Sequence, residues 1–597
     1  CSMTSSKITI DSLHSTYRNG GSVIEVIESL FKRISTISDP GIFITLIEKD
    51  VILAEAKALG NFDPISKPLW GVPFAIKDNI DAASIPTTAG CPEFSYIPDS
   101  DAAVVTRLRE AGAILIGKTN LDQFATGLVG TRSPYPLPKN ALDPSLIPGG
   151  SSSGSAVAVA QGIVAFALGT DTAGSGRVPA ALNGIFGLKP SFGVISTKGI
   201  VPACKTLDCV SIFSHNVSDA RRIFNVARLF DKNDPYSRHW LGSNSCANTP
   251  LRVGIPVSSD LKFFGDSSSE KSYNDFIGSL TDKGLQIMEL PFQNFYEVAN
   301  LLYEGPWVAE RYAAIQSFIE TEREALHPVT RSIIENAQKY SAIDTFHAMY
   351  RLKDLKSKVD EMMVDIDFLC VPTIPTSYTV EQNLADPIET NTRLGTYTNF
   401  VNLLELCALV IPTGSQPNGR ASSVTLIAED GKEHLLCDSA DQLTKPENVS
   451  FISDCEKKDF SLGIKEVEIA VVGAHLSGLP LNSELKELGA IFKRSVLTEK
   501  SYRLFELSGS LPPKPGLLRV AEGTGNVIEA EVWALSFEAF GRFISAIPSP
   551  LGIGIIRFDD GSQIQGFLVE HEAVVKARDI SEFGGWRNFI NKNKQPF

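Results

Sequence analysis

Two clusters rich in glycine and serine, separated by a run of small apolar residues, constrain the fold more than any other feature of the sequence. The first cluster spans residues 149–155, the second spans residues 169–176, and residues 156–168 between them are almost all apolar. Flexible linkers have a similar composition, but a linker does not enclose a segment that must be buried. The pattern therefore predicts two tight turns around one buried element, where backbone closely approaches backbone or a ligand.

The second cluster contains a candidate nucleophile. Ser175 follows three residues whose consecutive backbone N–H groups suit an oxyanion hole, namely Thr172, Ala173 and Gly174. A serine nucleophile needs a general base, and neither cluster has a histidine nearby in the sequence. The sequence therefore points to a base of another kind, carried by a buried segment.

Lys77 is the candidate base. It follows an apolar, strand-like segment that begins at residue 71. A lysine that is removed from water has a lowered pKa and can accept a proton near neutral pH. The alternative interpretation is an ordinary surface lysine at the end of a strand, and without the two serine clusters that alternative would be preferred.

These motifs resemble those of the amidase signature family, whose members are serine hydrolases with a Ser-Ser-Lys triad. Lys77 matches the catalytic lysine of the family, and Ser175 matches the nucleophile. Ser151 matches the bridging serine, which the family holds on a cis peptide. The match is weaker at residues 421–423, where members usually carry a Pro-Phe-Gly step and this sequence has Ala-Ser-Ser. That departure concerns the local loop and not the triad.

The resemblance implies a proton relay and an acyl-enzyme. Neutral Lys77 takes a proton from Ser151, Ser151 takes one from Ser175, and Ser175 Oγ attacks an amide carbonyl. Asp171 and Arg177 match a structural acid and a structural arginine of the family. No cofactor is implied, and the eight histidines and nine cysteines show no metal-binding spacing, so we expect no metal site.

Two further features resemble the allophanate hydrolase branch of this family. Gly176 stands where most members have an aliphatic residue, which implies a pocket shaped for a small polar substrate; a simple backbone turn is the alternative. Tyr303 and Arg311 match the pair with which that branch recognises its substrate. Allophanate is urea bearing a carboxylate, and a guanidinium selects it over neutral amides. The alternative for Arg311 is a solvated helix arginine paired with an acid such as Glu310.

The pattern of strands and helices predicts two domains. Alternation between residues 70 and 117 indicates α/β layering, and the resemblance implies a central mixed sheet covered by helices over residues 1–445, with a helical part at about 5–65. The polar, charged segment 446–465 is predicted to be a linker. Residues 466–597 contain short strands with polar turns, which predicts an α+β domain or a small β-barrel. This part resembles the C-terminal domain of allophanate hydrolases, which has a γ-glutamylcyclotransferase-like fold.

The resemblance also implies a task for the second domain. Cleavage of the terminal amide of allophanate leaves N-carboxycarbamate, which must lose CO2 before the second ammonia is released. His475, beside two glycines at the end of a strand, is the candidate acid or base for this step, and Arg503 and Arg519 are candidates for anion contacts. The alternative is a docking or dimerisation domain in which His475 is a buried structural residue.

Composition limits the partners. The chain of 597 residues is long enough for more than one domain, and its net charge of −14 argues against nucleic acid or anionic membrane as a main partner. No apolar run reaches the roughly 18 residues of a transmembrane helix. No secretory signal opens the sequence and the nine cysteines are scattered, so we expect a cytoplasmic protein with reduced thiols.

We therefore predict an amidohydrolase that converts allophanate to ammonia and CO2. The resemblance implies a biotin-dependent urea carboxylase as the source of the substrate, and we predict a homodimer. An amidase of another small amide remains open, as does one component of an amidotransferase, which needs partner proteins and a tRNA substrate; in both cases the second domain is only structural. A non-catalytic scaffold is disfavoured, because Lys77, Ser151 and Ser175 are all present.

Overall fold

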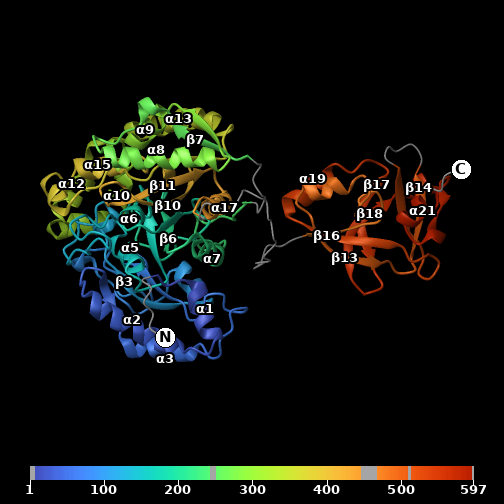
Figure 1. The fold of residues 1–597 in the computed structure, drawn as a ribbon, viewed down its shortest axis with the longest axis horizontal. Helices are drawn as coiled ribbons and strands as arrows, with labels where there is room; N and C mark the ends of the chain where they lie inside the picture. Colours follow the sequence, from blue (N-terminus) through green and yellow to red (C-terminus); the bar gives the residue numbers. More distant parts are fainter. Residues whose placement is uncertain (1–6, 243–249, 445–466, 508–512, 594–597) are drawn as a thin grey trace. The chain divides into compact units, whose positions relative to one another are not determined.

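The computed structural model describes residues 7–242, 250–444, 467–507 and 513–593. The chain divides into two compact units, Cys1–Asp454 and Cys455–Phe597, and we describe each by itself (Figure 1). The predicted linker 446–465 lies outside the described residues.

One mixed sheet runs through the first unit. In the described residues it has 11 strands, in the order β1 (Phe43–Leu46), β3 (Ile114–Thr119), β2 (Pro73–Lys77), β4 (Phe166–Asp171), β6 (Cys209–Ser214), β5 (Phe186–Lys189), β10 (Cys407–Ser415), β11 (Ala421–Ala428), β9 (Phe368–Pro372), β7 (Arg252–Pro256) and β8 (Gln286–Leu290). Strand β2 is parallel to both β3 and β4, and β7 is parallel to both β8 and β9, whereas the other pairs are antiparallel. This sheet and its helical cover confirm the predicted α/β class.

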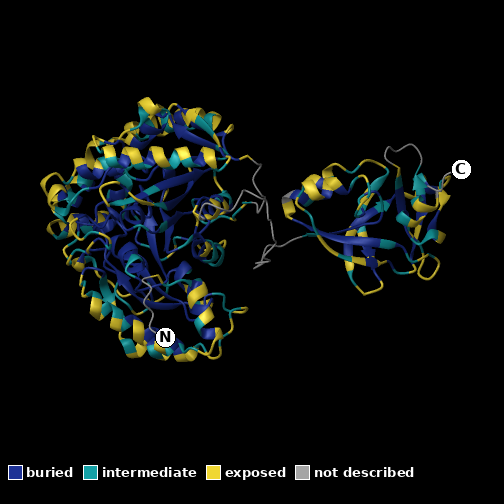
Figure 2. Cartoon of the chain, viewed as in Figure 1, coloured by how far each residue is buried: buried dark blue, intermediate teal, exposed yellow. Residues whose placement is uncertain are grey.

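Both faces of the sheet are buried. Successive side chains of a strand point to opposite faces, so the neighbours of consecutive residues show this. In β9, Phe368 and Cys370 belong to one hydrophobic core, while Leu369 and Val371 belong to another. Figure 2 shows the strands in the dark blue of buried residues and the exposed residues on the outer sides of the helices. Side chains at neighbouring positions of one strand therefore reach different environments.

Helices cover the two faces. The first unit contains α1 (Ile10–Arg18), α2 (Val23–Ile37), α3 (Lys49–Ala58), α4 (Ala103–Glu110), α5 (Ser153–Ala160), α6 (Val178–Leu182), α7 (Val217–Ala227), α8 (Ser267–Asp282), α9 (Gln293–Glu304), α10 (Val308–Ala314), α11 (Gln316–Thr321), α12 (Pro328–Glu335), α13 (Ala342–Met363), α14 (Val380–Ala385), α15 (Glu389–Leu394), α16 (Phe400–Leu403) and α17 (Glu433–Leu443). Apolar side chains of α5, α7, α8 and α17 join the first core, and those of α9, α13 and α16 join the second.

The N-terminal part differs from the expectation at one element. The sequence predicts helices throughout, and α1, α2 and α3 are present, but β1 lies between α2 and α3. This strand has only four residues and pairs with β3 at one edge of the sheet. Four residues, three half-buried and one exposed, are too few for a period of two to stand out in the sequence.

The small residues of the two glycine–serine clusters allow α5 to lie directly against the sheet. A Cβ atom on Gly154, in α5, would lie 2.6 Å from the backbone nitrogen of Asn120. A Cβ atom on Gly169, in β4, would lie 2.5 Å from Ser152 Oγ. Since real Cβ contacts are longer than this, only glycine fits at either position. The predicted close approach of backbone segments is thus confirmed.

The second unit is an α+β structure with two sheets, which is the first of the two classes that the sequence leaves open. Its described residues form a five-stranded sheet, β13 (Ile491–Leu497), β16 (Glu529–Leu535), β12 (Val467–Val471), β18 (Gln563–Val569) and β17 (Leu551–Arg557), and a three-stranded sheet, β15 (Lys514–Arg519), β14 (Tyr502–Leu507) and β19 (Arg578–Asp579). Its helices are α18 (Asn482–Glu487), α19 (Phe537–Ser545), α20 (His571–Val574) and α21 (Trp586–Asn593). A separate core forms between these elements. Over the described ranges of both units, no helix combines the length and apolar character that crossing a membrane requires.

Candidate active site

Lys77 lies at the end of strand β2, which runs between β3 and β4 inside the covered sheet, and its side chain is completely buried. Its Nζ atom is 2.7 Å from Ser151 Oγ and 2.8 Å from Thr170 Oγ1. Burial is the largest influence on this amine and lowers the pKa of Lys77 to about 7. A large share of the molecules therefore has a neutral amine at neutral pH, and this amine can accept a proton.

Ser151 lies in the loop that leads into α5, and the peptide bond between Gly150 and Ser151 is cis. Its hydroxyl donates to Ser175 Oγ at 2.8 Å. A side chain at position 150 would collide with Asp122 Oδ2, so the glycine lets this loop approach the buried carboxylate. The first cluster thus brings Ser151 between Lys77 and Ser175.

Ser175 lies in the turn between β4 and α6. Its hydroxyl is 3.4 Å from the carbonyl oxygen of Gly127. Within the described ranges, no protein atom accepts a hydrogen bond from the backbone N–H of Thr172, Ala173 or Gly174. Three unoccupied donors beside a hydroxyl are the arrangement that an oxyanion hole requires.

A buried ion pair holds this turn. Arg177 donates from Nε to Asp171 Oδ2 and from Nη2 to Asp171 Oδ1, both at 2.9 Å. The same guanidinium binds the carbonyl oxygen of Thr398 and Oδ1 of Asn402, each at 3.0 Å. Although burial raises the pKa of Asp171, Arg177, Lys189 and the backbone N–H of Gly176 together outweigh it and the net pKa is lowered, so the carboxylate stays charged. A paired, fully hydrogen-bonded ion pair of this kind tolerates burial.

The position of Gly176 is explained by packing. Its backbone N–H donates to Asp171 Oδ2 at 3.0 Å. A Cβ atom there would lie 2.6 Å from Ser211 Oγ, on strand β6, and still closer to Ser211 Cβ. The missing side chain would therefore point toward β6, so close packing is sufficient to require a glycine.

Arg311, in α10, is 3% exposed. Its Nη1 donates to the carbonyl oxygen of Ala125 at 3.1 Å and to Thr126 Oγ1 at 3.0 Å, and its Nη2 donates to Tyr303 Oη at 3.2 Å. Residues 125 and 126 directly precede Gly127, whose carbonyl contacts Ser175. The structure therefore brings Tyr303 and Arg311 to the loop beside the candidate nucleophile.

The alternative interpretation of Arg311 as a solvated arginine paired with Glu310 is wrong. Glu310 accepts instead from the backbone N–H of Thr206 at 3.1 Å. Arg132, whose residue type suits either an anion contact or a structural role, donates to the carbonyl oxygens of Thr126 and Pro387. These two hydrogen bonds fix Arg132 to the chain at residues 126 and 387.

Sequence reasoning missed several residues around the triad. Thr170 Oγ1 accepts from Lys77 and also, at 3.2 Å, from Asn79. Asp122 accepts backbone N–H groups of the 129–132 loop. Asp208 accepts from the hydroxyl of Thr172 and from the N–H groups of residues 203 and 204. No local motif marks these residues, because each meets its partner only through the fold.

His475, in the second unit, has a side chain that is 15% exposed. Its ring stacks on Phe567 with centroids 5.6 Å apart and meets the edge of Phe543 at 5.1 Å. Its Nε2 is 3.0 Å from Glu484 Oε2. Burial lowers the pKa of His475 more than Glu484 raises it, so the imidazole is neutral at neutral pH. Both interpretations of this residue, an acid–base group and a buried structural histidine, fit these contacts.

The two arginines proposed as anion contacts in the second unit are not brought to His475. Arg503 lies 3.7 Å from Asp579 and donates to the carbonyl oxygen of Thr524, and Arg519 is exposed. Among the described residues neither contacts His475. In the same ranges, no three His, Cys, Asp or Glu side chains form a cluster that would hold a metal ion.

Known proteins resemble this chain over both units. The Amidase family model matches residues 25–437, and the model of the allophanate hydrolase C-terminal domain matches residues 467–591. A solved structure of Kluyveromyces lactis allophanate hydrolase is 39% identical and superposes with a TM-score of 0.79, covering 99% of this chain and 100% of that chain.

Two relatives mark the extent of these similarities. Urea amidolyase of Saccharomyces cerevisiae is 43% identical over 96% of this chain, but the match covers only 32% of that protein. This chain thus spans about a third of the length of the urea amidolyases that it matches. Indoleacetamide hydrolase of Pseudomonas savastanoi is 32% identical over 62% of this chain and 82% of that protein. With a family model matched from residue 25 to residue 437, the chain belongs to the Amidase family.

Proposed function

We propose that this chain hydrolyses allophanate, with Ser175 as nucleophile and Lys77 as base. The observation that carries the proposal is the continuous line of hydrogen bonds from Lys77 Nζ through Ser151 Oγ to Ser175 Oγ. The similarity to Kluyveromyces lactis allophanate hydrolase over nearly the whole chain supports the choice of substrate.

The first step is a proton relay. Neutral Lys77 accepts the proton of Ser151, and Ser151 accepts the proton of Ser175, so that Ser175 Oγ attacks the carbonyl carbon of the terminal amide. An N–H of Lys77 donates to Thr170 Oγ1, which holds the amine at the distance from Ser151 at which its neutral form accepts the proton. Thr170 is therefore a positioning residue in this scheme.

The tetrahedral intermediate then collapses. Its oxyanion accepts hydrogen bonds from the N–H groups of Thr172, Ala173 and Gly174, which have no acceptor in the described protein. The proton held by Lys77 returns through Ser151 to the leaving nitrogen, and ammonia departs from the acyl-enzyme. Water, deprotonated by the same relay, cleaves the ester and releases N-carboxycarbamate.

Arg311 supplies the preference for a carboxylate-bearing substrate. Its guanidinium is buried beside the loop that contacts Ser175, and Tyr303 holds one of its nitrogens. A buried cation beside the loop that contacts the nucleophile favours an amide that carries its own anion a few atoms away. Neutral amides gain nothing from the same group.

The second unit completes the reaction in this proposal. N-carboxycarbamate must lose CO2 before the second ammonia is released, and neutral His475 beside Glu484 is the acid or base for that step. The similarity of residues 467–591 to the allophanate hydrolase C-terminal domain supports this assignment.

The longer relatives suggest where the substrate comes from. Proteins named urea amidolyase extend well beyond the region that this chain matches, which supports coupling to a biotin-dependent urea carboxylase, on the same or on another chain. The homodimer and the cytoplasmic location stay predictions.

Ammonia released per allophanate consumed tests the proposal. We expect Ser175→Ala to lower turnover by roughly ten-thousand-fold, because the nucleophile of the relay is lost. Ser153→Ala is the matched control, since Ser153 lies in the first cluster, two residues after Ser151, and its hydroxyl donates to the carbonyl oxygen of Asn120 and not to a triad residue. Activity retained by Ser175→Ala would contradict the triad, and a wild-type chain that cleaves neutral amides but not allophanate would contradict the substrate.

A further inference from the structure

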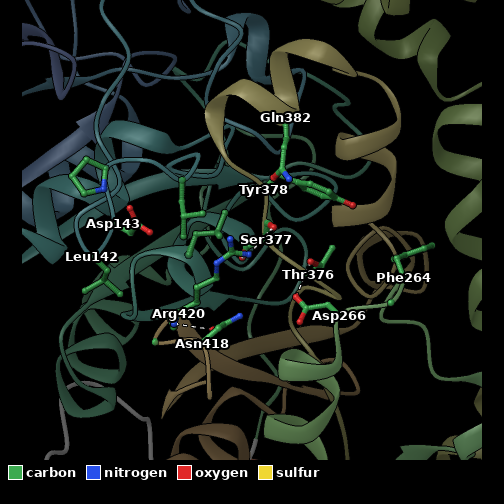
Figure 3. A pocket seen from close by; sticks show the side chains of 16 residues that line it. Leu142, Asp143, Phe264, Asp266, Thr376, Ser377, Tyr378, Gln382, Asn418 and Arg420 are labelled. Atoms are coloured by element: carbon green, nitrogen blue, oxygen red, sulfur yellow. Dashed lines mark hydrogen bonds between the residues drawn. The ribbon is translucent and has the colours of Figure 1, made fainter.

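The first unit contains a pocket of about 760 Å³ that none of the predicted triad residues lines. It is bounded by four chain segments, within residues 142–146, 264–266, 376–382 and 418–421, together with Leu182 at the end of α6. Figure 3 shows its side chains, with Arg420 near the centre. The sequence departs from the usual amidase pattern at Ala421, which also lines this pocket.

Arg420 uses only part of its guanidinium to bind the protein. Its Nη1 donates to the carbonyl oxygen of Ser377 at 3.2 Å and to Ser377 Oγ at 3.0 Å. Throughout the described residues, no hydrogen-bond acceptor is found for its Nε or Nη2. A guanidinium fixed at one nitrogen presents its remaining donors in a known direction.

Two amide side chains at the pocket are also fixed, and their NH2 groups have no acceptor among the residues that the structure describes. Gln382 Oε1 accepts from the backbone N–H of Thr379 at 2.9 Å. Asn418 Oδ1 accepts from the backbone N–H of Arg420 at 3.0 Å. Because each oxygen is held by a backbone donor, each NH2 group is the part left to bind a ligand.

The acids of the pocket are mostly committed to their own loops. Asp266 accepts from the N–H groups of Ser268 and Ser269 and from the hydroxyls of Ser269 and Thr376. Asp143, at the rim, accepts from Ser145 with one oxygen. Both carboxylates stay charged, and that of Asp143 interacts electrostatically with Arg420, so the groups of the pocket that remain available for hydrogen bonds are mainly donors.

We propose that this pocket is a second binding site, which takes a small molecule bearing an oxyanion, either a carboxylate or a phosphate. Such a group has several acceptor oxygens and a negative charge, which the free nitrogens of Arg420 match as a fork. The amides of Gln382 and Asn418 bind the remaining acceptors of the ligand. The site does not depend on the hydrolysis proposed above, because it shares no triad residue with it.

Calorimetric titration of the full chain with malonate, and separately with inorganic phosphate, tests this site. We expect saturable binding of at least one probe with a dissociation constant of roughly 1 mM or less, and the probe that binds identifies the kind of oxyanion. Arg420→Gln is expected to weaken binding at least about tenfold, because the fork is lost. Asp143→Asn is expected to strengthen it, because a negative charge leaves the rim.

A matched control separates a local effect from loss of charge in general. Arg323→Gln removes an exposed arginine that pairs with Glu324 and Glu335 outside the pocket, and we expect it to bind the probe as the wild type does. Thermal unfolding of each variant shows that it is folded. The proposal is overturned if the wild type binds neither probe saturably, or if Arg420→Gln and Asp143→Asn both bind as tightly as the wild type.

Discussion

The pKa of Lys77 decides the pH range in which the proposed relay works. The amine must be neutral to accept a proton, and burial places its pKa at about 7. We therefore expect kcat/KM for allophanate to fall about tenfold per pH unit below this pKa and to level off above it. A pH profile of initial rates measures this fall in kcat/KM below the pKa. Circular dichroism at each pH is the control for folding. A profile that stays flat down to about pH 5 would mean that Lys77 is not the base.

Arg311 is the residue whose replacement should change specificity. Arg311→Lys keeps the positive charge but loses the planar fork, so we expect kcat/KM for allophanate to fall roughly tenfold or more while that for biuret, a neutral analogue, changes little. Competition of the two amides for the variant and the wild type measures the ratio. Equal losses for both substrates would assign Arg311 to the support of the 125–127 loop alone.

At the scale of elements, the turn between β4 and α6 is held against β6 by a glycine. Gly176→Ala places a methyl group against Ser211, and overpacking of this kind costs about 1–3 kcal/mol. We expect a lower midpoint of thermal unfolding for Gly176→Ala and partial recovery in Gly176→Ala combined with Ser211→Gly. Ser211→Gly alone is the reference that completes the cycle. If the two substitutions changed the unfolding midpoint independently and additively, the contact with Ser211 would not be the reason for a glycine at position 176.

At the scale of the whole molecule, the two units divide the proposed reaction between them. We expect His475→Ala to release the first ammonia at the normal rate and the second more slowly, with N-carboxycarbamate accumulating, because the amide is cleaved in the other unit. Carbon-13 NMR of labelled allophanate, together with an ammonia assay, follows both products.

His571→Ala is the control for this experiment, since His571 is an exposed histidine of the same unit. Two ammonia molecules released at the wild-type rate by His475→Ala would make the second unit structural. Loss of both ammonia molecules would show instead that the substitution disturbs the first unit.

The sequence by itself was sufficient to nominate Lys77, Ser151 and Ser175 and to predict both fold classes. These residues stand in local motifs, and alternating strands and helices leave a periodic pattern of apolar residues. The structure places Ser151 within hydrogen-bond distance of both Lys77 and Ser175, while the roles of the three residues stay predictions. The short strand β1 was not predicted, because four residues carry too little pattern.

Only the tertiary structure decided which residues surround the triad and where a second pocket opens, away from the triad. Thr170 is 93 positions from Lys77 along the chain, and Arg420 is 43 positions from Ser377. Such contacts form only when segments that are distant in the sequence pack together in the fold. A sequence motif indicates the chemistry that a residue can perform. The pKa of that residue, its hydrogen-bond partners and the donors that a pocket presents follow from burial and geometry.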